Sequence, residues 1–341
     1  MTFRLHPGAW AGALDDAELD ALRDAALAVR GDADGEWDLV RLVGERIGAM
    51  APGNAARHLV GLAAVAAVDL TIARRLEPHL DALGILRQAG VTPPDGVLGV
   101  FAAEAPGARL QVDDEHVLRG RKPWCSLAAE LDHALVTAHA PGGRRLLLVD
   151  LRHPGVAVQP AEGWVAKGLP RVPSTPVDFD AVPAAPVGEV GWYLERPGFA
   201  LGGIAVAACW WGGSVGLVGA LDAYAVRKRD DPLALLALGE AAVALHGAEL
   251  SLAAAARAVD ERLLDDEALR LLAQGVRSAV RGAADRIRSI AVATLGPAPL
   301  AFDAEYAQRV ADLELYTAQD HGARDLARLG ALLLEHEDRP W

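Results

Sequence analysis

Three adjacent residues, Trp124, Cys125 and Ser126, offer an aromatic ring, a thiol and a hydroxyl within one short segment. A basic turn at 119–122 precedes them, and a strand-like run at 133–138 follows. Taken alone, this pattern is typical of a β-hairpin that carries a half-buried Trp. No arrangement of basic residues and histidine beside Cys125 indicates thiol catalysis, so packing is the expected role of its side chain.

Other catalytic and metal-binding patterns are poorly represented. The stretch Gly212-Gly-Ser-Val-Gly216 has the letters of a Gly-x-Ser-x-Gly motif but lies inside a helix-like run, so we expect no nucleophile elbow, and the chain has no P-loop. The glycines at 213, 216 and 219 fall in a helix-like run without a preceding strand, so they form no dinucleotide fingerprint. The cluster at 335–338 could chelate a metal, but an acidic terminus is more often solvated. We expect no metal site, because four histidines lack spaced partners: His58, His79, His133 and His246.

Composition restricts the possible classes of function. The chain has 341 residues, of which 52% are hydrophobic and 5% aromatic, and its formal net charge is −13. The length favours two or three domains. The negative charge argues against general nucleic-acid binding, although a few local arginines could still hold an anionic ligand. Two cysteines give no disulfide framework, and the first residues lack the apolar core of a signal peptide, so we expect a cytoplasmic protein.

The elements that must position these residues change in character along the chain. Residues 1–95 predict a helical N-terminal domain, with a long apolar run from Asn54 that Pro78 should kink or restart. Residues 96–189 contain short β-like runs punctuated by Gly and Pro and predict a β-rich middle domain. Within them, the Pro-rich segment 170–186 is expected to be extended edge structure or a linker.

Residues 190–341 predict a C-terminal helical bundle whose last helix spans roughly 303–334. Within it, residues 197–221 carry no charge and are long enough to cross a bilayer, which takes about 20 apolar residues. The glycines at 202, 203, 212, 213, 216 and 219 dilute the hydrophobicity of this segment, so a helix buried inside the bundle is expected instead of a membrane span. The predicted fold is therefore α+β and mostly α: a helical N-terminal domain, a central β-barrel or sandwich, and a C-terminal four-helix bundle.

This order of regions, together with the segment Gly120-Arg-Lys-Pro-Trp-Cys-Ser126, resembles the acyl-CoA dehydrogenase family. That family has a Gly-x-Lys-x-Trp-Ile-Thr stretch and a following Ala-Asp-x-x-x-Val-x-Ala strand that face the flavin. Trp124 and Ser126 fall on the matching positions. The resemblance implies FAD as cofactor, with Trp124 packed against the isoalloxazine ring and Ser126 hydrogen-bonded near flavin N5. The whole segment, Cys125 included, is then expected to contact the cofactor.

A second segment, Phe101-Ala-Ala-Glu-Ala-Pro-Gly-Ala108, resembles the start of the family's Thr-Glu-Pro-Gly-Ala-Gly-Ser-Asp loop but lacks its Gly-Ser-Asp end. The resemblance implies that Phe101 lines the flavin and that the backbone groups of Ala102 and Ala103 reach its pyrimidine edge. Since the family loop shapes the mouth of the substrate cavity, the lost end implies a changed or truncated acyl site.

Three further residues are assigned by the resemblance alone. Asp320 falls where many members keep the glutamate that removes the substrate α-proton, although a solvated, salt-linked helix end is the alternative. Arg227 falls near the family arginine that reaches the flavin pyrophosphate of a neighbouring subunit, although a charge cluster at a helix end is usually surface. Gly296 stands at a turn near the adenosine half of FAD, where the second glycine of the family is missing.

The resemblance thus implies an FAD-dependent oxidoreductase that desaturates an acyl-CoA or a related acyl substrate. Asp320 would take the α-proton while the β-hydrogen leaves as hydride to flavin N5. Two alternatives remain open: a flavin monooxygenase or oxidase on the same scaffold, and a catalytically silent homologue kept for assembly or partner binding. The family also implies a homodimer or homotetramer. We expect neither a nucleic-acid partner nor a membrane partner.

Overall fold

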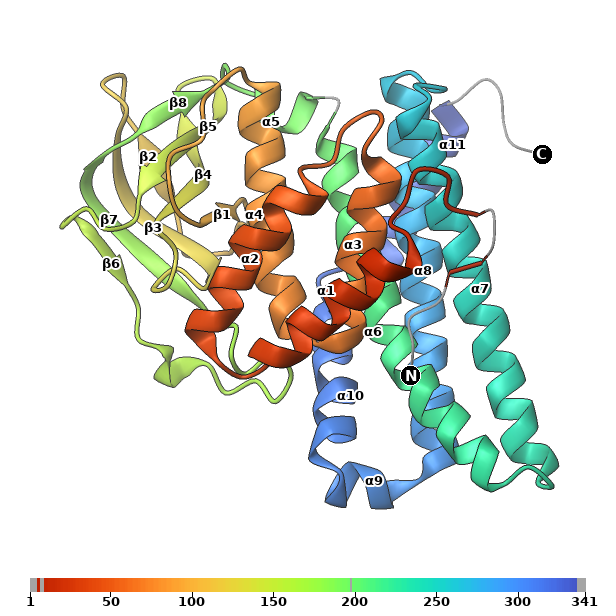
Figure 1. The fold of residues 1–341 in the computed structure, drawn as a ribbon. Coiled ribbons are helices and arrows are strands. Elements are labelled where there is room, and N and C mark those ends of the chain that lie inside the picture. The colour runs from red at the N-terminus through yellow and green to blue at the C-terminus, as the bar shows by residue number, and fades with distance from the viewer. Residues whose placement is uncertain (1–4, 7–8, 197, 336–341) are drawn as a thin grey trace.

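The computed structural model describes residues 5–6, 9–196 and 198–335, and Figure 1 shows their arrangement. The N-terminal helices are α1 (Asp16–Val29), α2 (Ala33–Ile47), α3 (Ala55–Val68) and α4 (Leu70–Gln88). The strands are β1 (Leu98–Phe101), β2 (Leu110–Val112), β3 (Val117–Ser126), β4 (His133–Ala140), β5 (Gly143–Asp150), β6 (Val156–Val158), β7 (Ser174–Pro183) and β8 (Ala185–Val187), with a 3-10 turn at Ala161–Gly163. The C-terminal helices are α5 (Trp192–Glu195), α6 (Phe199–Arg227), α7 (Pro232–Asp260), α8 (Asp266–Leu295), α9 (Pro297–Phe302), α10 (Ala304–Thr317) and α11 (Ala323–Glu335).

Two helix boundaries differ from the sequence prediction. The apolar run from Asn54 breaks at Asp69, whose extended backbone (φ −155°, ψ 123°) lets its carboxylate accept the Thr71 backbone N–H at 2.7 Å and cap α4. Pro78 remains inside α4. The predicted last helix is two helices, α10 and α11, and the turn between them contains Gly322 with φ +56°. The hydrophobic pattern alone does not show either break. Most of the predicted cluster at 335–338 lies outside the described residues.

The strands form one mixed sheet in the order β6-β7-β3-β2-β4-β5-β8, with β1 also beside β4 (Figure 1). The pairs β1–β4 and β2–β4 are parallel and the others antiparallel. The Pro-rich segment expected to be an edge or a linker is instead β7, which pairs with both β3 and β6. Pro176 is tolerated there because it lies opposite a bulge in β3, between the pairs Thr175–Cys125 and Val177–Lys122, where the ladder is already interrupted.

Helix α4 joins the helical part to the sheet. Ala82, Ile85 and Leu86 on its C-terminal half are fully buried against strand residues that include Leu98 of β1 and Leu135 of β4. The first half of α4 packs with the other helices in the main hydrophobic core. Because one helix belongs to both cores, it can carry side chains into the space between sheet and bundle.

The uncharged segment forms most of α6, which contacts α3, α7, α8 and α10. Two helices, α6 and α7, are apolar and long enough to cross a membrane. In α6, 78% of the most apolar stretch is buried inside the protein and Trp210 is fully buried, which confirms the predicted core helix. Helix α7 lies at the outer edge of the bundle (Figure 1), and only 28% of its most apolar stretch is buried.

We predict that Gly212→Ala destabilises the protein by about 1–3 kcal/mol, because α6 approaches α3 too closely for a side chain. A Cβ atom on Gly212 would lie 2.2 Å from the Ala63 carbonyl oxygen and 2.8 Å from the Ala66 Cβ. Gly239→Ala in α7 is the matched control, since its Cβ meets nothing within 4 Å and should gain about 1 kcal/mol of helix propensity. Urea unfolding of both variants checks the opposite signs.

Candidate functional site

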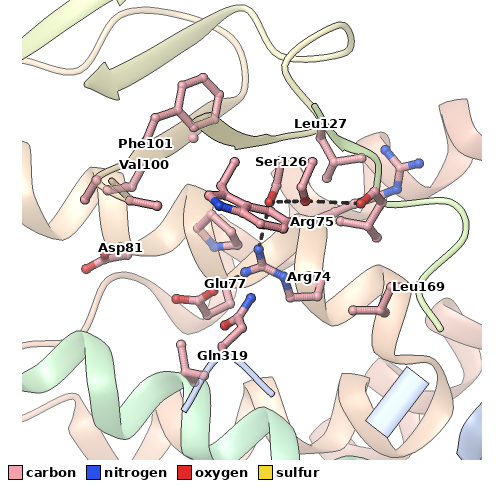
Figure 2. Close-up of a pocket in the computed structure, with 18 of the residues that line it drawn as sticks. Arg74, Arg75, Glu77, Asp81, Val100, Phe101, Ser126, Leu127, Leu169 and Gln319 are labelled. Atoms are coloured by element: carbon pink, nitrogen blue, oxygen red, sulfur yellow. Dashed lines mark hydrogen bonds and ion pairs between the residues drawn. The ribbon is translucent and has the colours of Figure 1, made fainter. Parts of the chain in front are cut away.

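A cavity of about 650 Å³ lies between α4, strands β1 and β3, and the turn after α10 (Figure 2). Its two main walls differ in chemistry. Phe101, Trp124 and Leu127 give the sheet side an apolar and aromatic surface, whereas α4 contributes the charged side chains of Arg74 and Glu77. The volume is in the range of small-molecule and cofactor sites. A flat ring could therefore lie against the sheet wall, with the ionisable side chains of α4 on its other side.

Trp124 reaches the cavity because of the bulge in β3. The register with β7 shifts between Lys122 and Cys125, and Trp124 adopts φ +57°, which few residues other than glycine adopt. The Trp124 side chain therefore does not follow the regular alternation of strand side chains between the two faces of the sheet. It is 57% exposed and lines the cavity. Strained backbone of this kind persists where the surrounding structure holds it, and it is concentrated at ligand-binding positions.

The side chain of the next residue, Cys125, lies in the hydrophobic core and not in the cavity. Its side chain is fully buried, and its thiol donates to the Lys122 carbonyl oxygen at 3.4 Å. Burial raises the pKa of Cys125 to about 12, so the thiol stays protonated at neutral pH. The sulfur does not line the cavity. The role in packing that the sequence indicated for this side chain agrees with its position, while a contact between Cys125 and a cofactor stays a prediction.

Ser126 is joined to α4 by a buried guanidinium (Figure 2). Arg74 donates from Nη2 to Ser126 Oγ at 3.2 Å and from Nη1 to Glu77 Oε2 at 3.0 Å, while Ser174 Oγ lies 2.7 Å from Ser126 Oγ. Since arginine only donates, Ser126 uses a lone pair for Arg74 and keeps its own O–H for Ser174 or for an acceptor on a ligand. Arg74 also stacks over the Tyr316 ring at 5.1 Å.

Two carboxyl groups of α4 face the cavity one turn apart, at Glu77 and Asp81. Burial raises the pKa of Glu77 to about 7, with Arg74 acting in the opposite direction and Asp81 adding to the rise. Burial also raises the pKa of Asp81, and Arg196 opposes it from 3.8 Å. Among the described residues, no donor hydrogen-bonds to Asp81. The α4 wall of the cavity thus holds one carboxyl, Glu77, with a pKa of about 7, and a second, Asp81, that can accept a hydrogen bond from a ligand.

A second ionic network fixes the edge of the cavity. Arg75 contacts Glu36 at 3.0 Å and Glu130 at 2.5 Å, and Arg171 contacts Glu36 at 2.5 Å. Trp37 donates from Nε1 to Glu130 at 2.9 Å and lies under the Arg75 guanidinium. These contacts tie α2 and α4 to the segments beside β3 and β7. The position of Arg74 and Glu77 relative to the sheet is therefore set by several buried ion pairs rather than by one.

The charged residues of α4 that line the cavity were not predicted from the sequence. Arg74, Glu77 and Asp81 follow one another at intervals of three and four, which places them on one face of a helix. Charged residues on one face of a helix with many buried positions were a usable signal. Pro78 obscured that signal because it suggested a break in the helix at this place.

The structure brings together part of the site predicted from the sequence. Phe101, Ala103, Trp124 and Ser126 all line the cavity. Asp320 does not, although its neighbours Gln319 and His321 do.

The Asp320 carboxylate is engaged elsewhere. It is almost completely buried, receives the Arg277 Nε–H at 3.2 Å and accepts the Gly322 backbone N–H at 2.8 Å. Arg277 itself stacks over Trp210. The alternative interpretation of the sequence was a solvated, salt-linked helix end; the carboxylate is salt-linked but buried, and it does not line the cavity. The role of Asp320 as a base stays a prediction.

Arg227 and Gly296 are both distant in the fold from the cavity-lining residues. Arg227 is the exposed last residue of α6, and Gly296 joins α8 to α9 with φ +72°. Neither lines the cavity of this chain. The contact of Arg227 with the flavin pyrophosphate of a neighbouring subunit, and the place of Gly296 near the adenosine half of FAD, stay predictions.

Comparison with known proteins identifies relatives by structure only. No family model matches the chain, and no curated protein matches its sequence. The solved structure of KijD3 in complex with FMN and dTDP-3-amino-2,3,6-trideoxy-4-keto-3-methyl-D-glucose is 19% identical with a TM-score of 0.76, over 95% of this chain and 93% of that one.

Two further neighbours resemble the chain over nearly its whole length. TdsC from Paenibacillus sp. A11-2, a dibenzothiophene monooxygenase solved with FMN and indole, is 18% identical with a TM-score of 0.71, over 97% of this chain and 93% of that one. The nitrososynthase from Micromonospora carbonacea var. africana is 16% identical with a TM-score of 0.75, over 96% of each chain. The chain has the acyl-CoA dehydrogenase-like fold, mostly helical around a mixed sheet, which confirms the predicted fold class.

Proposed function

We propose that this protein is a flavin-dependent monooxygenase that uses FMN in the cavity between α4 and the sheet. The observation that carries the proposal is the cavity itself, in which an exposed indole, a serine hydroxyl and a carboxyl of raised pKa meet (Figure 2). The neighbours KijD3 and TdsC, solved with FMN, support the choice of cofactor, and the monooxygenase TdsC supports the choice of reaction.

The residues of the cavity fit a flavin ring. Trp124 and Phe101 offer aromatic surface to the isoalloxazine, and the backbone groups of Ala103 lie beside them for its pyrimidine edge. Ser126 has an O–H to donate toward N5. Arg74 Nε is a buried donor that no described residue accepts, and the flavin ring carries nitrogen and carbonyl acceptors. We propose FMN over FAD because the neighbours KijD3 and TdsC were solved with FMN.

The flavin supplies the redox chemistry, and the protein supplies alignment, electrostatics and proton handling. Bound FMN, kept reduced by an external reductant, would supply two hydrogens with which O₂ adds one oxygen atom to the substrate and releases the other as water. The protein therefore needs a group beside the ring that can carry a proton.

Glu77 is the group placed for that task. Its pKa of about 7 keeps both protonation states populated near neutral pH, where a proton carrier works best. Arg74 holds Glu77 and Ser126 through the same guanidinium, so the carboxyl is fixed relative to the residue assigned to flavin N5. Asp81, one turn further along α4, is free to accept a hydrogen bond from the substrate.

Desaturation of an acyl thioester is the second candidate. It requires a carboxylate base at the substrate α-carbon, and the salt-linked Asp320 is poorly placed for it. Glu77 is a carboxyl of the cavity and would have to act instead. This candidate is therefore favoured only by the presence of that carboxyl and by the fold.

We also propose that α7 packs against a second copy of the chain. Its outward face carries Leu233, Leu236 and Val243, which are 71%, 56% and 76% exposed. Several exposed apolar side chains on one face of a helix are typical of a protein interface. Leu236→Lys with Val243→Lys should lower the mass measured by light scattering to that of one chain. Val165→Lys, at an 82% exposed position away from α7, is the control and should leave the mass unchanged.

We predict that the purified protein binds FMN with the visible absorption of oxidised flavin. Ser126→Ala should weaken binding about tenfold, the effect of one lost hydrogen bond. Ser251→Ala, whose hydroxyl bonds only to a carbonyl within α7, is the control and should bind FMN normally. Anaerobic bleaching of the bound flavin by acyl-CoA compounds would favour the dehydrogenase, and a failure to bind any flavin would leave the silent homologue.

We predict that Glu77 sets the pH dependence of reoxidation of the reduced FMN-protein by O₂, followed by stopped flow. As an acid it must be protonated, so the rate should be constant below pH 7 and fall about tenfold per pH unit above it. Glu77→Gln should remove this inflection. Glu115→Gln, at an exposed turn before β3, should keep it. An inflection that persists unchanged in Glu77→Gln would exclude Glu77 as the proton carrier.

A further inference from the structure

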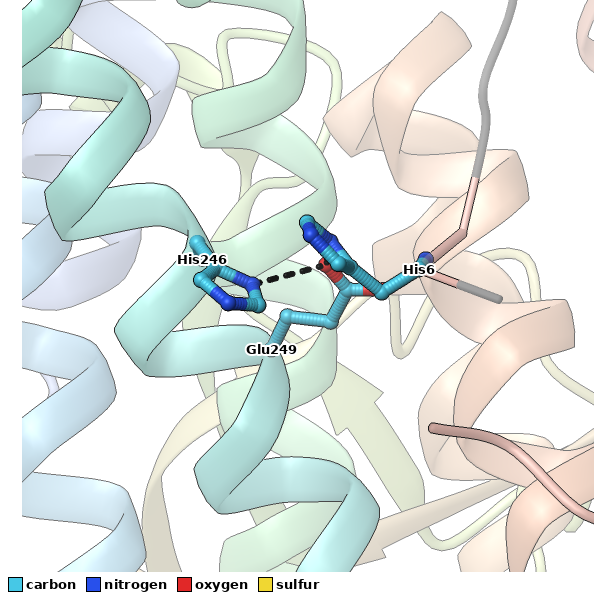
Figure 3. Close-up of side chains that lie close together, drawn as sticks. All are labelled: His6, His246 and Glu249. Carbon is cyan, nitrogen blue, oxygen red and sulfur yellow. Dashed lines mark hydrogen bonds and ion pairs between the residues drawn. The ribbon is translucent and has the colours of Figure 1, made fainter. Parts of the chain in front are cut away.

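Three side chains with metal-ligating atoms meet at a place far from the cavity. His6 comes from the N-terminal segment, and His246 and Glu249 come from one face of α7, three residues apart (Figure 3). Their ligating atoms all lie within 4.8 Å of one another. The cluster could not be predicted from the sequence, because His6 is 240 residues away from His246 along the chain.

The carboxylate of Glu249 is oriented before any ligand arrives. Its Oε1 atom accepts the His6 backbone N–H at 2.7 Å and the Trp10 indole N–H at 3.1 Å. Glu249 is 4% exposed, so these two donors fix the plane of the carboxylate and direct Oε2 toward both imidazoles. Hydrogen bonds of this kind, from groups outside the ligand set, hold metal-binding carboxylates in other proteins.

Both imidazoles lie near the same carboxylate oxygen, Oε2 of Glu249. His6 Nδ1 lies 3.0 Å from Glu249 Oε2, and His246 Nδ1 lies 3.8 Å from it. Tetrahedral ligation with bonds of about 2.1 Å requires ligand atoms roughly 3.4 Å apart, and both distances fall within about 0.4 Å of that value. The rings are stacked with centroids 3.7 Å apart and an angle of 25° between them, so both Nδ1 atoms reach toward the carboxylate from one side.

One of these nitrogen atoms has no hydrogen bond. His246 Nδ1 is buried and lies 3.8 Å from Glu249 Oε2, but it makes no hydrogen bond with any described residue. A lone pair on this atom is therefore available to a cation. His6 is exposed, so when its Nδ1 binds a cation, its Nε2–H can face water.

We propose that His6, His246 and Glu249 bind a divalent transition-metal cation, with zinc the best fit to two nitrogen ligands and one carboxylate oxygen, and that this cation fastens the N-terminal segment to α7. Water completes the coordination on the exposed side of His6.

The test is a titration of the full chain, stripped with chelator, with Zn²⁺ at pH 7.5. We expect one equivalent to bind by calorimetry and the melting temperature to rise by at least about 3 °C in excess Zn²⁺. Co²⁺ should give the visible absorption of a tetrahedral site. Trp10 bonds to the ligand Glu249, so its fluorescence should change on binding.

Variants locate the site without relying on any activity. His6→Ala changes an exposed side chain and His246→Ala a partly exposed one, so neither should unfold the protein, and each should weaken Zn²⁺ binding at least tenfold. Glu249→Gln should also weaken it, although an amide oxygen can still accept from Trp10. His153→Ala, in the turn after β5, is the control and should bind normally. No bound equivalent in the parent chain, or unchanged binding in both histidine variants, would overturn the proposal.

Discussion

The guanidinium of Arg74 is the contact around which the cavity is organised. A buried positive charge is costly unless it is paired, so the chain must bring it a carboxylate and further acceptors. Glu77 and Ser126 meet this need from a helix and from a strand, and the Tyr316 ring covers the guanidinium from α10. Arg74 thus links the bundle to the sheet, together with the ion pairs of Arg75 and Arg171, and its contacts hold a titratable carboxyl and the serine hydroxyl on one guanidinium.

The bulge in β3 gives the sheet side of the cavity its character. In a regular strand, neighbouring side chains alternate between the two faces. The interruption in β3 and the positive φ of Trp124 place the indole in the cavity, while Cys125 is sealed in the core. Pro176 of β7 faces the same interruption, so the missing N–H of the proline removes no ladder hydrogen bond there. The strained backbone of Trp124 in β3 and the proline in β7 thus belong to the same β-bulge.

Predictions from the sequence were accurate where the signal was local. The order of helices, strands and helices, and the burial of the uncharged helix α6, follow from composition and periodicity. Phe101, Trp124 and Ser126 line one cavity, as the family resemblance implied. The strand β7 was missed because three prolines within it or beside it suggested a linker, and only the bulge of the partner strand explains their tolerance. Asp320 was assigned to a family position by resemblance alone, and in the structure its carboxylate forms an ion pair with Arg277 of α8.

The sequence by itself determined the class of fold, the apolar core helix and the aromatic and hydroxyl groups of the sheet wall, because these depend on side-chain type and on spacing within one element. Only the tertiary structure decided which charges meet. Arg74 and Ser126 are 52 residues apart, Arg277 and Asp320 are 43 apart, and His6 and Glu249 are 243 apart. The pKa of a carboxyl, and its availability to a substrate or a cation, depend on burial and on such distant partners, which no local pattern encodes.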